Sequence, residues 1–455
     1  MYTCGPTVYD FAHIGNFRTF VFEDLLRRYL KYKSFQVKHV MNLTDVDDKT
    51  IRRSREEKRP LREVTDRYAN AFFEDLEKLN IERAEVYPRA TEHIPEMTAL
   101  IQALLKRKYA YIAPDKSVYY SIKKFKKYGQ LAHINIEELQ AGASGRVISD
   151  QYEKAQASDF ALWKAWDAED GEVGWEAPFG KGRPGWHVEC SAMSLKHLTN
   201  AFSNGFVPKE ASTIDIHAGG EDLIFPHHED EIAQSEGATR KKFVKYWLHS
   251  AFLNVEGKKM SKSLGNFFTL RDIMAKGYDP LSFRYAMLSV HYRQPLNFTF
   301  EVLEASTKAV QRLNDFVLRL KDAHAQVDNP KLPKLLERAA KRFERSLDND
   351  LDISPALAAV FDLVSAINKL LDKCALSAAD AQKTSELMAR FDSVLGVLKK
   401  SEPLEPELQK LIDEREHCRE IKNWARSDEI RDELKKRGIV IEDTPHGTRW
   451  KRVLS

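Results

Sequence analysis

Cysteine is scarce in this sequence of 455 residues, which contains only Cys4, Cys190, Cys374 and Cys418. No two of them form a Cys-x-x-Cys pair, and four scattered thiols do not make a disulfide framework. Cys374 and Cys418 lie in helical or charged segments of the C-terminal half, and we assign them no role. The shortage of cysteine predicts a reducing compartment and a cytoplasmic protein.

Long apolar runs are missing too. No stretch reaches the roughly 18 apolar residues of a membrane span, and the opening residues MYTC lack the basic region of a secretory signal. The formal net charge is only +3, so binding to a nucleic acid would depend on local patches. We expect no membrane association, and the length predicts several domains.

The first residues carry a possible nucleotide-binding turn. Residues 8–9 are typical of the end of a buried strand, residues 12–15 form a tight turn, and residues 17–33 have apolar positions at helical spacing. The unpaired N–H groups and the positive dipole end of such a helix attract anions. His13 and Asn16 stand where this helix begins, so both could face a triphosphate. Taken alone, the four residues also fit an ordinary turn histidine.

A second motif, GKKMSKSLGN, occupies residues 257–266 and follows the apolar run at 251–255. Flexible glycines flank lysines whose ammonium groups could approach a phosphate and stabilise the charge that develops there. A solvated basic loop is the alternative interpretation of the same composition.

Two of the cysteines belong to a possible metal site. His227 and Glu231 stand four residues apart, which places them on one face of a helix. Together with Cys4 and Cys190 they offer two thiolates, an imidazole and a carboxylate, an acceptable set for zinc. Three distant segments would build this site, which favours a role in an active site. The spacing is equally compatible with buried apolar thiols and with histidines, including His228, that cap a helix.

Both motifs resemble the signatures of class I aminoacyl-tRNA synthetases. Residues 259–263 read KMSKS, and residues 13–16 resemble the HIGH signature with Asn16 in place of the final histidine. Further segments resemble cysteinyl-tRNA synthetases in particular, namely residues 1–10, 42–49, 185–193, 215–220, 225–231 and 247–249. The resemblance extends from Met1 to Trp450, and the sequence is identified as a member of this family. Members of the family carry a short segment before the position of Met1.

The resemblance implies roles for individual residues. The implied zinc ligands, for one ion per chain, are Cys4, Cys190, His227 and Glu231. The walls of the amino-acid pocket are implied at Thr44, Trp186 and His217. The ATP site is implied at His13, Gly15, Asn16, Gly219, Gly220, Asp222, Lys259 and Lys262. Four of these are the expected catalytic residues, namely His13, Asn16, Lys259 and Lys262. The choice of His227 over His228 depends on the family and on the four-residue spacing to Glu231.

Zinc has a physical reason to be in such a pocket, because cysteine and serine differ by one atom. An apolar pocket would separate them only modestly, whereas zinc prefers a soft anionic ligand and lowers the pKa of a bound thiol. The implied reaction has two steps. L-cysteine attacks the α-phosphorus of ATP, with Mg²⁺ present, to give cysteinyl-adenylate, and the 3′-terminal ribose of tRNA(Cys) then accepts the cysteinyl group.

The resemblance implies an α/β fold, with a Rossmann-type catalytic domain, an inserted connective domain, a helical bundle and a small C-terminal α+β anticodon-binding domain. The predicted segments are 1–85 and 166–245 for the two catalytic halves, 86–165 for the insertion, 246–300 for the stem-contact region with the lysine loop, 301–400 for the bundle and 401–455 for the last domain. Residues 200–213 are longer than the usual link and predict an exposed loop. We expect a monomer.

The C-terminal tail contains a possible RNA-binding surface. Trp450 could stack on an unpaired base while Arg449 and Arg452 hold phosphates. In the alternative, Trp450 packs the last strand against a helix. Two other functions remain open at this point. A mycothiol-type cysteine ligase shares the motifs but its relatives lack this tail, and an inactive paralogue that binds tRNA would have lost motifs that are intact here.

Overall fold

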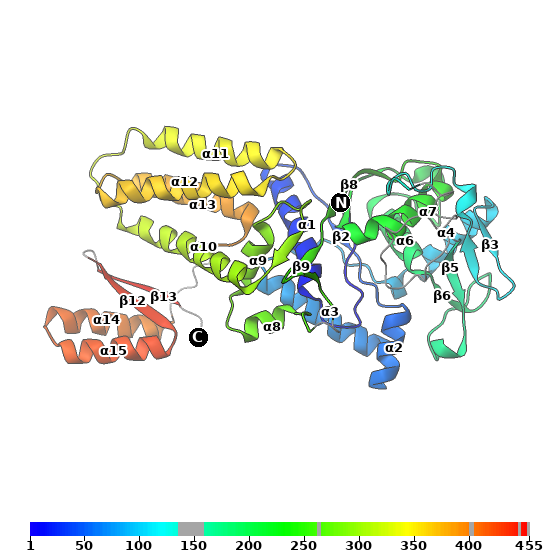
Figure 1. Ribbon diagram of the computed structural model, residues 1–455, viewed down its shortest axis with the longest axis horizontal. Coiled ribbons are helices and arrows are strands. Elements are labelled where there is room, and N and C mark those ends of the chain that lie inside the picture. The colour runs from blue at the N-terminus through cyan, green and yellow to red at the C-terminus, as the bar shows by residue number, and fades with distance from the viewer. Residues whose placement is uncertain (135–158, 262–264, 400–404, 445–446, 453–455) are drawn as a thin grey trace. The chain divides into compact units, whose positions relative to one another are not determined.

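The structure is a computed structural model that describes residues 1–134, 159–261, 265–399, 405–444 and 447–452 (Figure 1). The chain divides into two compact units. The first comprises Met1–Leu270 and Val290–Thr299, and the second comprises Arg271–Ser289 and Phe300–Ser455.

A four-stranded parallel sheet lies in the first unit, with the strand order β2-β1-β7-β8. The strands are β1 (Tyr2–Thr3), β2 (Val40–Met41), β7 (Ile214–Gly220) and β8 (Val244–Ser250). Strands β1 and β7 are far apart in the sequence but pair directly. Parallel strands joined through helices are typical of a nucleotide-binding α/β domain. The sheet continues through Ser250, beyond residue 245, where the sequence places the end of the second catalytic half.

Helix α1 (Ile14–Tyr32) begins at the glycine turn that follows β1. The sequence predicts a strand that ends at residues 8–9, but β1 already ends at Thr3. Two neighbours explain the early end. Pro6 cannot donate a hydrogen bond to a sheet, and a Cβ on Gly5 would lie only 1.9 Å from the carbonyl oxygen of Asn42. Regular pairing therefore stops at Thr3, and the chain returns to it only at Thr7, which forms a single parallel bridge with Thr44.

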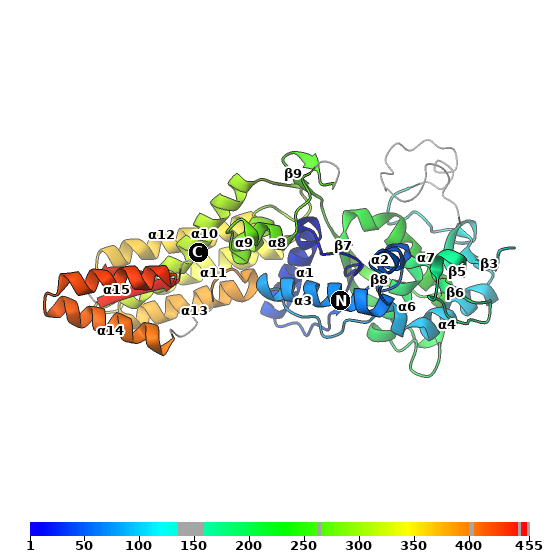
Figure 2. The same cartoon turned by 90° about the horizontal axis from the view of Figure 1, so that it is seen from below.

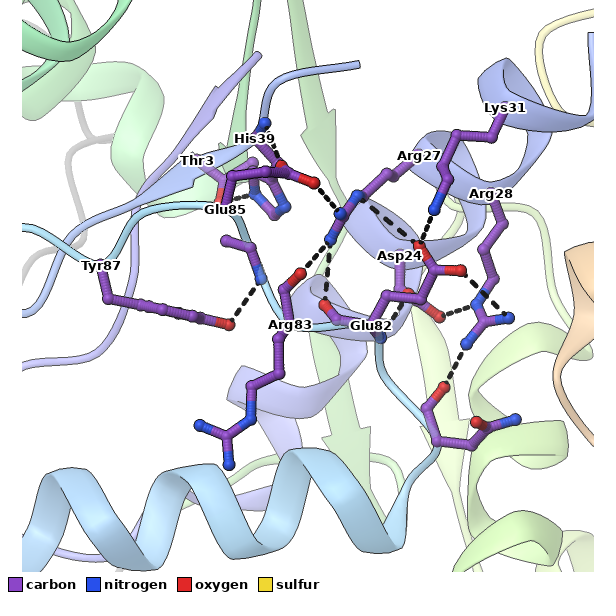
Figure 3. Close-up of polar contacts among 12 residues, drawn as sticks. Thr3, Asp24, Arg27, Arg28, Lys31, His39, Glu82, Arg83, Glu85 and Tyr87 are labelled. Carbon is purple, nitrogen blue, oxygen red and sulfur yellow. Dashed lines mark hydrogen bonds and ion pairs between the residues drawn. The ribbon is translucent and has the colours of Figure 1, made fainter. Parts of the chain in front are cut away.

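A buried polar network ties α1 to the segment that follows α3 (Figure 3). Arg27 donates to the backbone carbonyl of Glu82 and pairs with the carboxylate of Glu85 at 2.5 Å. Arg28 pairs with Asp24 at 2.7 Å, and Asp24 also accepts a hydrogen bond from the backbone N–H of Glu82. Since the buried charges of Arg27, Arg28 and Asp24 are all paired, their burial is tolerated. The network holds residues 82–85, the segment that follows α3, against α1.

The other long helices of the first unit cover the sheet and its insertion. They are α2 (Asp48–Glu57), α3 (Leu61–Lys78), α4 (Ile94–Lys106), α6 (Trp186–Leu198) and α7 (Glu229–Thr239). Helix α6 packs against both α4 and α7. The region that the sequence predicts as an exposed loop, residues 200–213, is mostly exposed, but Ala201 and Ala211 are buried and anchor it.

A second sheet of four antiparallel strands belongs to the predicted insertion. Its strands, in the order β3-β4-β5-β6, are Ala110–Ile112, Val118–Tyr120, Phe160–Ala165 and Gly182–Pro184. The sheet extends to Pro184, beyond the predicted end of the insertion at residue 165, because β6 pairs with β5. Residues 110–112 and 118–120 form strands that pair antiparallel with each other.

A third, three-stranded sheet carries the start of the lysine-rich segment. Its strands, in the order β10-β9-β11, are Lys258–Lys259, Leu253–Val255 and Leu296–Phe298. Strands β9 and β10 pair antiparallel through the turn at Gly257, whose φ of +73° suits a residue without a side chain. Lys259 therefore stands at the end of a tight hairpin.

The second unit begins with short helices and continues as a helical bundle. Its helices are α8 (Leu270–Ala275), α9 (Pro280–Leu288), α10 (Phe300–Arg319), α11 (Leu332–Asp348), α12 (Ile353–Asp372) and α13 (Ala378–Leu395). In both views α11 and α12 lie side by side (Figures 1 and 2). These helices agree with the loss of glycine and the helical spacing that the sequence shows beyond residue 299.

Helix α12 is long and apolar enough to cross a membrane by length and composition, with a mean hydropathy of 1.4. A core helix of a bundle meets the same measure. Its buried residues recur at intervals of one to three, and Val360, Leu363, Val364 and Ile367 are among them. Because α12 packs against α11, this apolar side is covered by protein.

The chain ends in a helical pair followed by a hairpin. These elements are α14 (Pro406–Glu420), α15 (Trp424–Lys436), β12 (Ile439–Thr444) and β13 (Gly447–Arg452). Their core contains Leu408, Ile412, Ile430 and Leu434, and Trp450 packs against it. The structure thus agrees with the alternative interpretation of Trp450, in which the last strand packs on a helix.

Gly396 ends α13 in the left-handed conformation, at φ +65°, and packs against a buried arginine. The Arg284 side chain donates to the carbonyl of Leu395 at 2.7 Å, and a Cβ on Gly396 would lie 3.0 Å from its guanidinium. We expect Gly396→Ala to cost about 1–2 kcal/mol for the left-handed backbone and more for displacing Arg284. The thermal unfolding midpoint measures the loss.

Gly277→Ala is the matched control. Gly277 has φ +86°, but among the described atoms none lies within 4 Å of the position that a Cβ would take there. It should lose only the backbone contribution, so its midpoint should fall less than that of Gly396→Ala. Equal midpoints would contradict the role of Arg284.

Candidate metal and nucleotide site

Four buried side chains from three segments of the first unit converge at one point. Cys4 follows β1, Cys190 lies in α6, and Glu231 lies in the first turn of α7. His227 belongs to the wide turn η6 (Ile224–His228) that leads into α7. Their ligand atoms all lie within 4.8 Å of one another. The structure thus brings together the four residues that the sequence selects as metal ligands.

The structure also shows a second possible ligand set that the sequence did not select. It consists of Cys4, His217, His228 and Glu231. His228 Nε2 lies 3.4 Å from Cys4 Sγ, and His217 Nε2 lies 3.1 Å from Glu231 Oε2. Consecutive residues of a regular helix would point in different directions. In η6 the backbone at Phe225 is not helical, and both histidines are buried.

Burial shapes the protonation of these groups in the metal-free protein. Desolvation raises the pKa of the Cys4 thiol and of the Glu231 carboxyl well above their ordinary values. It lowers the pKa of His227 and of His228 well below the ordinary value, and that of His217 to about 3. The imidazoles are therefore neutral near pH 7, and neutral imidazole is the form that binds a metal.

One buried atom points to a cation. His227 Nε2 is buried and forms no hydrogen bond to any described residue, although it lies 3.2 Å from Glu231 Oε1. A buried ring nitrogen and a carboxyl group that face each other without a hydrogen bond lack the compensation that buried polar groups normally have. Two sulfur atoms complete the set, and thiolate with imidazole suits a soft or borderline metal. The residues present therefore fit a metal ion of this kind.

The three predicted pocket residues lie around this cluster. Trp186 stacks on His227 with ring centroids 4.2 Å apart, and 37% of its surface is exposed. His217 is fully buried and stacks on Trp247 at 4.6 Å. Thr44 is buried in the loop after β2.

Thr44 is linked to the metal cluster through one amide side chain. Asn42 donates to Thr44 Oγ1 at 3.1 Å and accepts from the backbone N–H of Gly5 at 2.9 Å. Gly5 directly follows Cys4, so the same amide positions Thr44 and the metal-ligand segment.

The predicted phosphate-facing residues bond to each other at the start of α1. His13 Nδ1 accepts from the backbone N–H of Asn16 at 3.2 Å, and the Asn16 side chain accepts from the backbone N–H of His13 at 3.1 Å. This reciprocal pair is a capping box. Because Nδ1 accepts, the neutral His13 ring carries its proton on Nε2. Asn16 thus replaces a histidine with a residue that closes the helix cap.

The lysine segment meets the glycine turn. Met260 is the link, since a Cβ on Gly15 would lie 3.3 Å from the end of its side chain. The backbone N–H of Ile14 donates to the carbonyl of Phe268 at 2.9 Å. Motifs separated by most of the first unit's sequence are therefore neighbours in the fold.

The Asn266 side chain bridges two backbone groups of the lysine segment. Its side chain accepts from the backbone N–H of Ser261 at 2.8 Å and donates to the carbonyl of Lys259 at 3.2 Å. The Lys259 side chain is exposed. Lys262, the second predicted catalytic lysine, lies outside the described residues.

Gly219, Gly220 and Asp222 stand at the carboxyl end of β7, where ligands bind in open α/β sheets. A Cβ on Gly219 would lie 3.1 Å from the ring of His228, and one on Gly220 would lie 2.4 Å from an oxygen of Asp222. A side chain at either position would therefore press on His228 or displace Asp222. Burial raises the pKa of the Asp222 carboxyl, and the charge of Lys259 opposes that shift.

The predicted RNA-binding residues belong to the C-terminal hairpin. Trp450 is half-buried against the local core. Arg449 and Arg452 lie in β13, but their side chains are outside the described part of the structure. Trp424, at the start of α15, is instead 56% exposed, although no sequence pattern marks it as a site residue.

Three family models match the chain in order. Residues 1–308 match the class I (C) tRNA synthetase catalytic domain, residues 342–399 match the DALR domain, and residues 401–450 match the cysteinyl-tRNA ligase anticodon binding domain. The chain belongs to the cysteine–tRNA ligase family. The predicted family and the predicted fold class are thereby confirmed, and with them the class I synthetase type of enzyme.

Curated relatives agree over nearly their full length. A cysteine–tRNA ligase of Protochlamydia amoebophila is 51% identical over 99% of this chain and 93% of its own length. The cysteine–tRNA ligase of Chlamydia muridarum is 49% identical over 100% of this chain and 95% of its own length. The cysteine–tRNA ligase of Brachyspira hyodysenteriae is 48% identical over 99% of this chain and 94% of its own length.

Solved structures of other class I synthetases share the fold. Methionyl-tRNA synthetase of Mycobacterium tuberculosis, in complex with methionyl-adenylate, matches with a TM-score of 0.61 at 16% identity, over 87% of this chain and 89% of that one. A putative arginyl-tRNA synthetase of Campylobacter jejuni matches with a TM-score of 0.57 at 14% identity, over 88% of this chain and 94% of that one. At this identity the likeness concerns the fold alone.

The affinity of this site for a metal should rise with pH. Burial raises the pKa of Cys4 and of Glu231, and each of these groups must lose its proton to bind a cation. Each proton released increases the apparent affinity by about tenfold per pH unit below the pKa of its group. His227 is already neutral and releases none.

Titration with Co²⁺ at several pH values between 6 and 8, read from the thiolate-to-cobalt absorption band, measures this slope. An affinity that does not change with pH would show that the ligands are already deprotonated without metal.

Proposed function

We propose that the chain activates L-cysteine with ATP and transfers it to the 3′-terminal ribose of tRNA(Cys), with one Zn²⁺ bound by Cys4, Cys190, His227 and Glu231. The observation that carries the proposal is the convergence of these four buried side chains at the end of β1, the strand that precedes the glycine turn. Family membership supports the reaction. The donor set supports zinc over harder metals.

Bound zinc would supply a soft Lewis acid for the thiolate of cysteine, a ligand that a serine hydroxyl cannot easily replace. The residues around it would orient and enclose the amino acid. Trp186, stacked on His227 and partly exposed, is suited to cover the bound side chain. His217 and Trp247 form an aromatic wall that excludes water. Thr44 would contact the polar end of the amino acid.

The nucleotide would lie at the turn before α1. The N–H proton on His13 Nε2 and the positive dipole end of α1 would attract phosphate oxygens. Gly219, Gly220 and Asp222 would hold the adenosine at the end of β7. Lys259 and Lys262 would stabilise the charge that develops as the carboxylate of cysteine displaces pyrophosphate, with Mg²⁺ arriving on ATP.

The domains would divide the work as the sequence predicts. The catalytic halves, predicted at 1–85 and 166–245, would carry the chemistry, and the insertion, predicted at 86–165 but with a sheet that extends to Pro184, would place the acceptor end. The region at 246–300 would contact the stem of the tRNA, and the bundle at 301–400 would support residues 401–455 at the anticodon. In that last domain, Trp450 with Arg449 and Arg452 remains the predicted surface. The exposed Trp424 supports a second stacking position in the same domain.

The match to a cysteine-specific anticodon domain favours tRNA over an amino-sugar as the acceptor. The intact motifs favour an active enzyme over an inactive paralogue. We further propose that the protein acts in the cytoplasm as a monomer.

The decisive test is aminoacylation of unfractionated tRNA with labelled cysteine and ATP, with labelled serine in a parallel reaction. We expect acid-precipitable cysteine and no serine above background. Adenylate formation without charged tRNA would instead indicate a ligase with another acceptor.

Cys190→Ser should abolish metal binding and cysteine activation together, because serine keeps the size but not the soft anionic ligand. Cys374→Ser is the matched control, since Cys374 is exposed and distant in sequence from every ligand. Metal content by mass spectrometry and pyrophosphate exchange measure the two effects. A normal metal content in Cys190→Ser would refute the ligand assignment.

Lys262→Ala should slow adenylate formation by about a hundredfold or more, the range seen when a charge-stabilising donor is lost, without loss of metal. Pyrophosphate exchange measures the rate, and Lys258→Ala, at an exposed neighbouring lysine, is the control. Unchanged exchange in Lys262→Ala would remove this lysine from the mechanism.

A further inference from the structure

A continuous line of polar contacts leads from the metal cluster into the insertion. His227 Nδ1 lies 2.8 Å from His187 Nδ1. His187 Nε2 lies 3.3 Å from Asp230 Oδ2, and the hydroxyl of Tyr128 donates to Asp230 Oδ1 at 2.5 Å. All four side chains are buried. Tyr128 is therefore three contacts from a predicted metal ligand, although it belongs to a different part of the sequence.

The order of protons along this line follows from one requirement. His227 Nε2 faces Glu231 in the cluster, and it can bind a cation only if its ring proton sits on Nδ1. That proton is donated to His187 Nδ1, which must then accept. His187 consequently carries its own proton on Nε2, which faces Asp230. Asp230 receives hydrogen bonds at both oxygens, from His187 and from Tyr128.

The neighbouring carboxylate holds the same segment of the insertion. Glu229 accepts from the backbone N–H groups of Gly129, Leu131 and Ala132 at 2.7, 3.0 and 3.1 Å. Gly129 has φ +92°, and a Cβ there would lie 2.3 Å from the carbonyl oxygen of Ile134. The backbone of residues 128–132 is thus tightly specified and bound to the first turn of α7, the turn that also carries Glu231.

We propose that Tyr128 is a positioning residue of the metal centre, acting through Asp230 and His187 to hold the His227 ring in the orientation and tautomer that bind metal. The inference rests on the proposed function, because it assumes that His227 is a ligand. Partners behind a metal-bound histidine commonly change metal affinity by 10- to 100-fold. Residues 128–132 thereby make metal binding depend on the insertion.

Tyr128→Phe is the direct test. It removes the hydroxyl but keeps the ring, which packs edge-on against Phe225 with centroids 6.3 Å apart. We expect the affinity for Zn²⁺, measured by competition with a chelator, to fall about tenfold. The spectrum of the Co²⁺-substituted protein should also change, and KM for cysteine in pyrophosphate exchange should rise more than kcat falls.

Tyr120→Phe is the matched control. Tyr120 is also buried in the insertion, and its hydroxyl donates to α7 at 2.8 Å, but to the backbone carbonyl of Ala233 instead of the line to His227. It should leave Zn²⁺ affinity and the Co²⁺ spectrum unchanged. Equal losses in the two tyrosine variants would mean that both act by packing alone, and the inference would be wrong.

Asp230→Asn provides a second variant. An amide in place of the carboxylate offers one acceptor instead of two, so it disrupts the line more than Tyr128→Phe. We expect a larger loss of Zn²⁺ affinity than in Tyr128→Phe, with the folded state checked by near-UV circular dichroism. If Asp230→Asn does not fold, Tyr128→Phe and its control still decide the question.

The unaltered protein separates this inference from the proposed function. If it binds Zn²⁺ and charges tRNA while Tyr128→Phe matches it in affinity and spectrum, only the role of Tyr128 is refuted. If it binds no Zn²⁺ at the cluster, the proposed function itself fails, and the inference with it.

Discussion

The parallel pairing of β1 with β7 is the constraint on which the site depends. Tyr2 lies opposite His217 and Thr3 opposite Ala218, and the backbone N–H of Cys4 donates to the carbonyl of Ala218 at 3.4 Å. Parallel strands present their carboxyl ends at one edge of a sheet. This pairing therefore sets Cys4 and the glycines at the end of β7 at the same edge. The η6 turn and α7 then add His227 and Glu231.

This arrangement buries a dense group of ionisable side chains, which is unfavourable for stability. Thiol, carboxyl and imidazole groups lie in a region where desolvation raises the pKa of acids and lowers that of bases. His187 and His249 follow the same rule, each with a pKa of about 3. Such a core would be less stable than an apolar one of the same volume. Departures of this kind from good packing are typical of functional sites, where a bound ion compensates the charge.

Hydrogen bonds join the insertion directly to helix α7 of the catalytic domain, next to the metal cluster. Glu229 and Asp230 at the start of α7 bind residues 128–132, while Glu231, the next residue, faces the metal cluster. Three consecutive acidic residues thus serve two neighbouring structures, because successive residues of α7 point in different directions. A change in the insertion is transmitted to the cluster through hydrogen bonds of defined length and not through loose contact.

The sequence by itself determined the family, the two signature motifs and the four-residue spacing of His227 and Glu231, because these are local patterns that survive without coordinates. It also indicated the helical bundle at 301–400. Only the tertiary structure decided which side chains share an environment. It turned His228 inward beside His227, ended β1 at Thr3 and packed Trp450 against a core while exposing Trp424. It also linked Tyr128 to His227 through Asp230 and His187. Such contacts depend on pairings between distant segments and on turns with non-helical backbone, and neither has a signature in the order of residues along one segment.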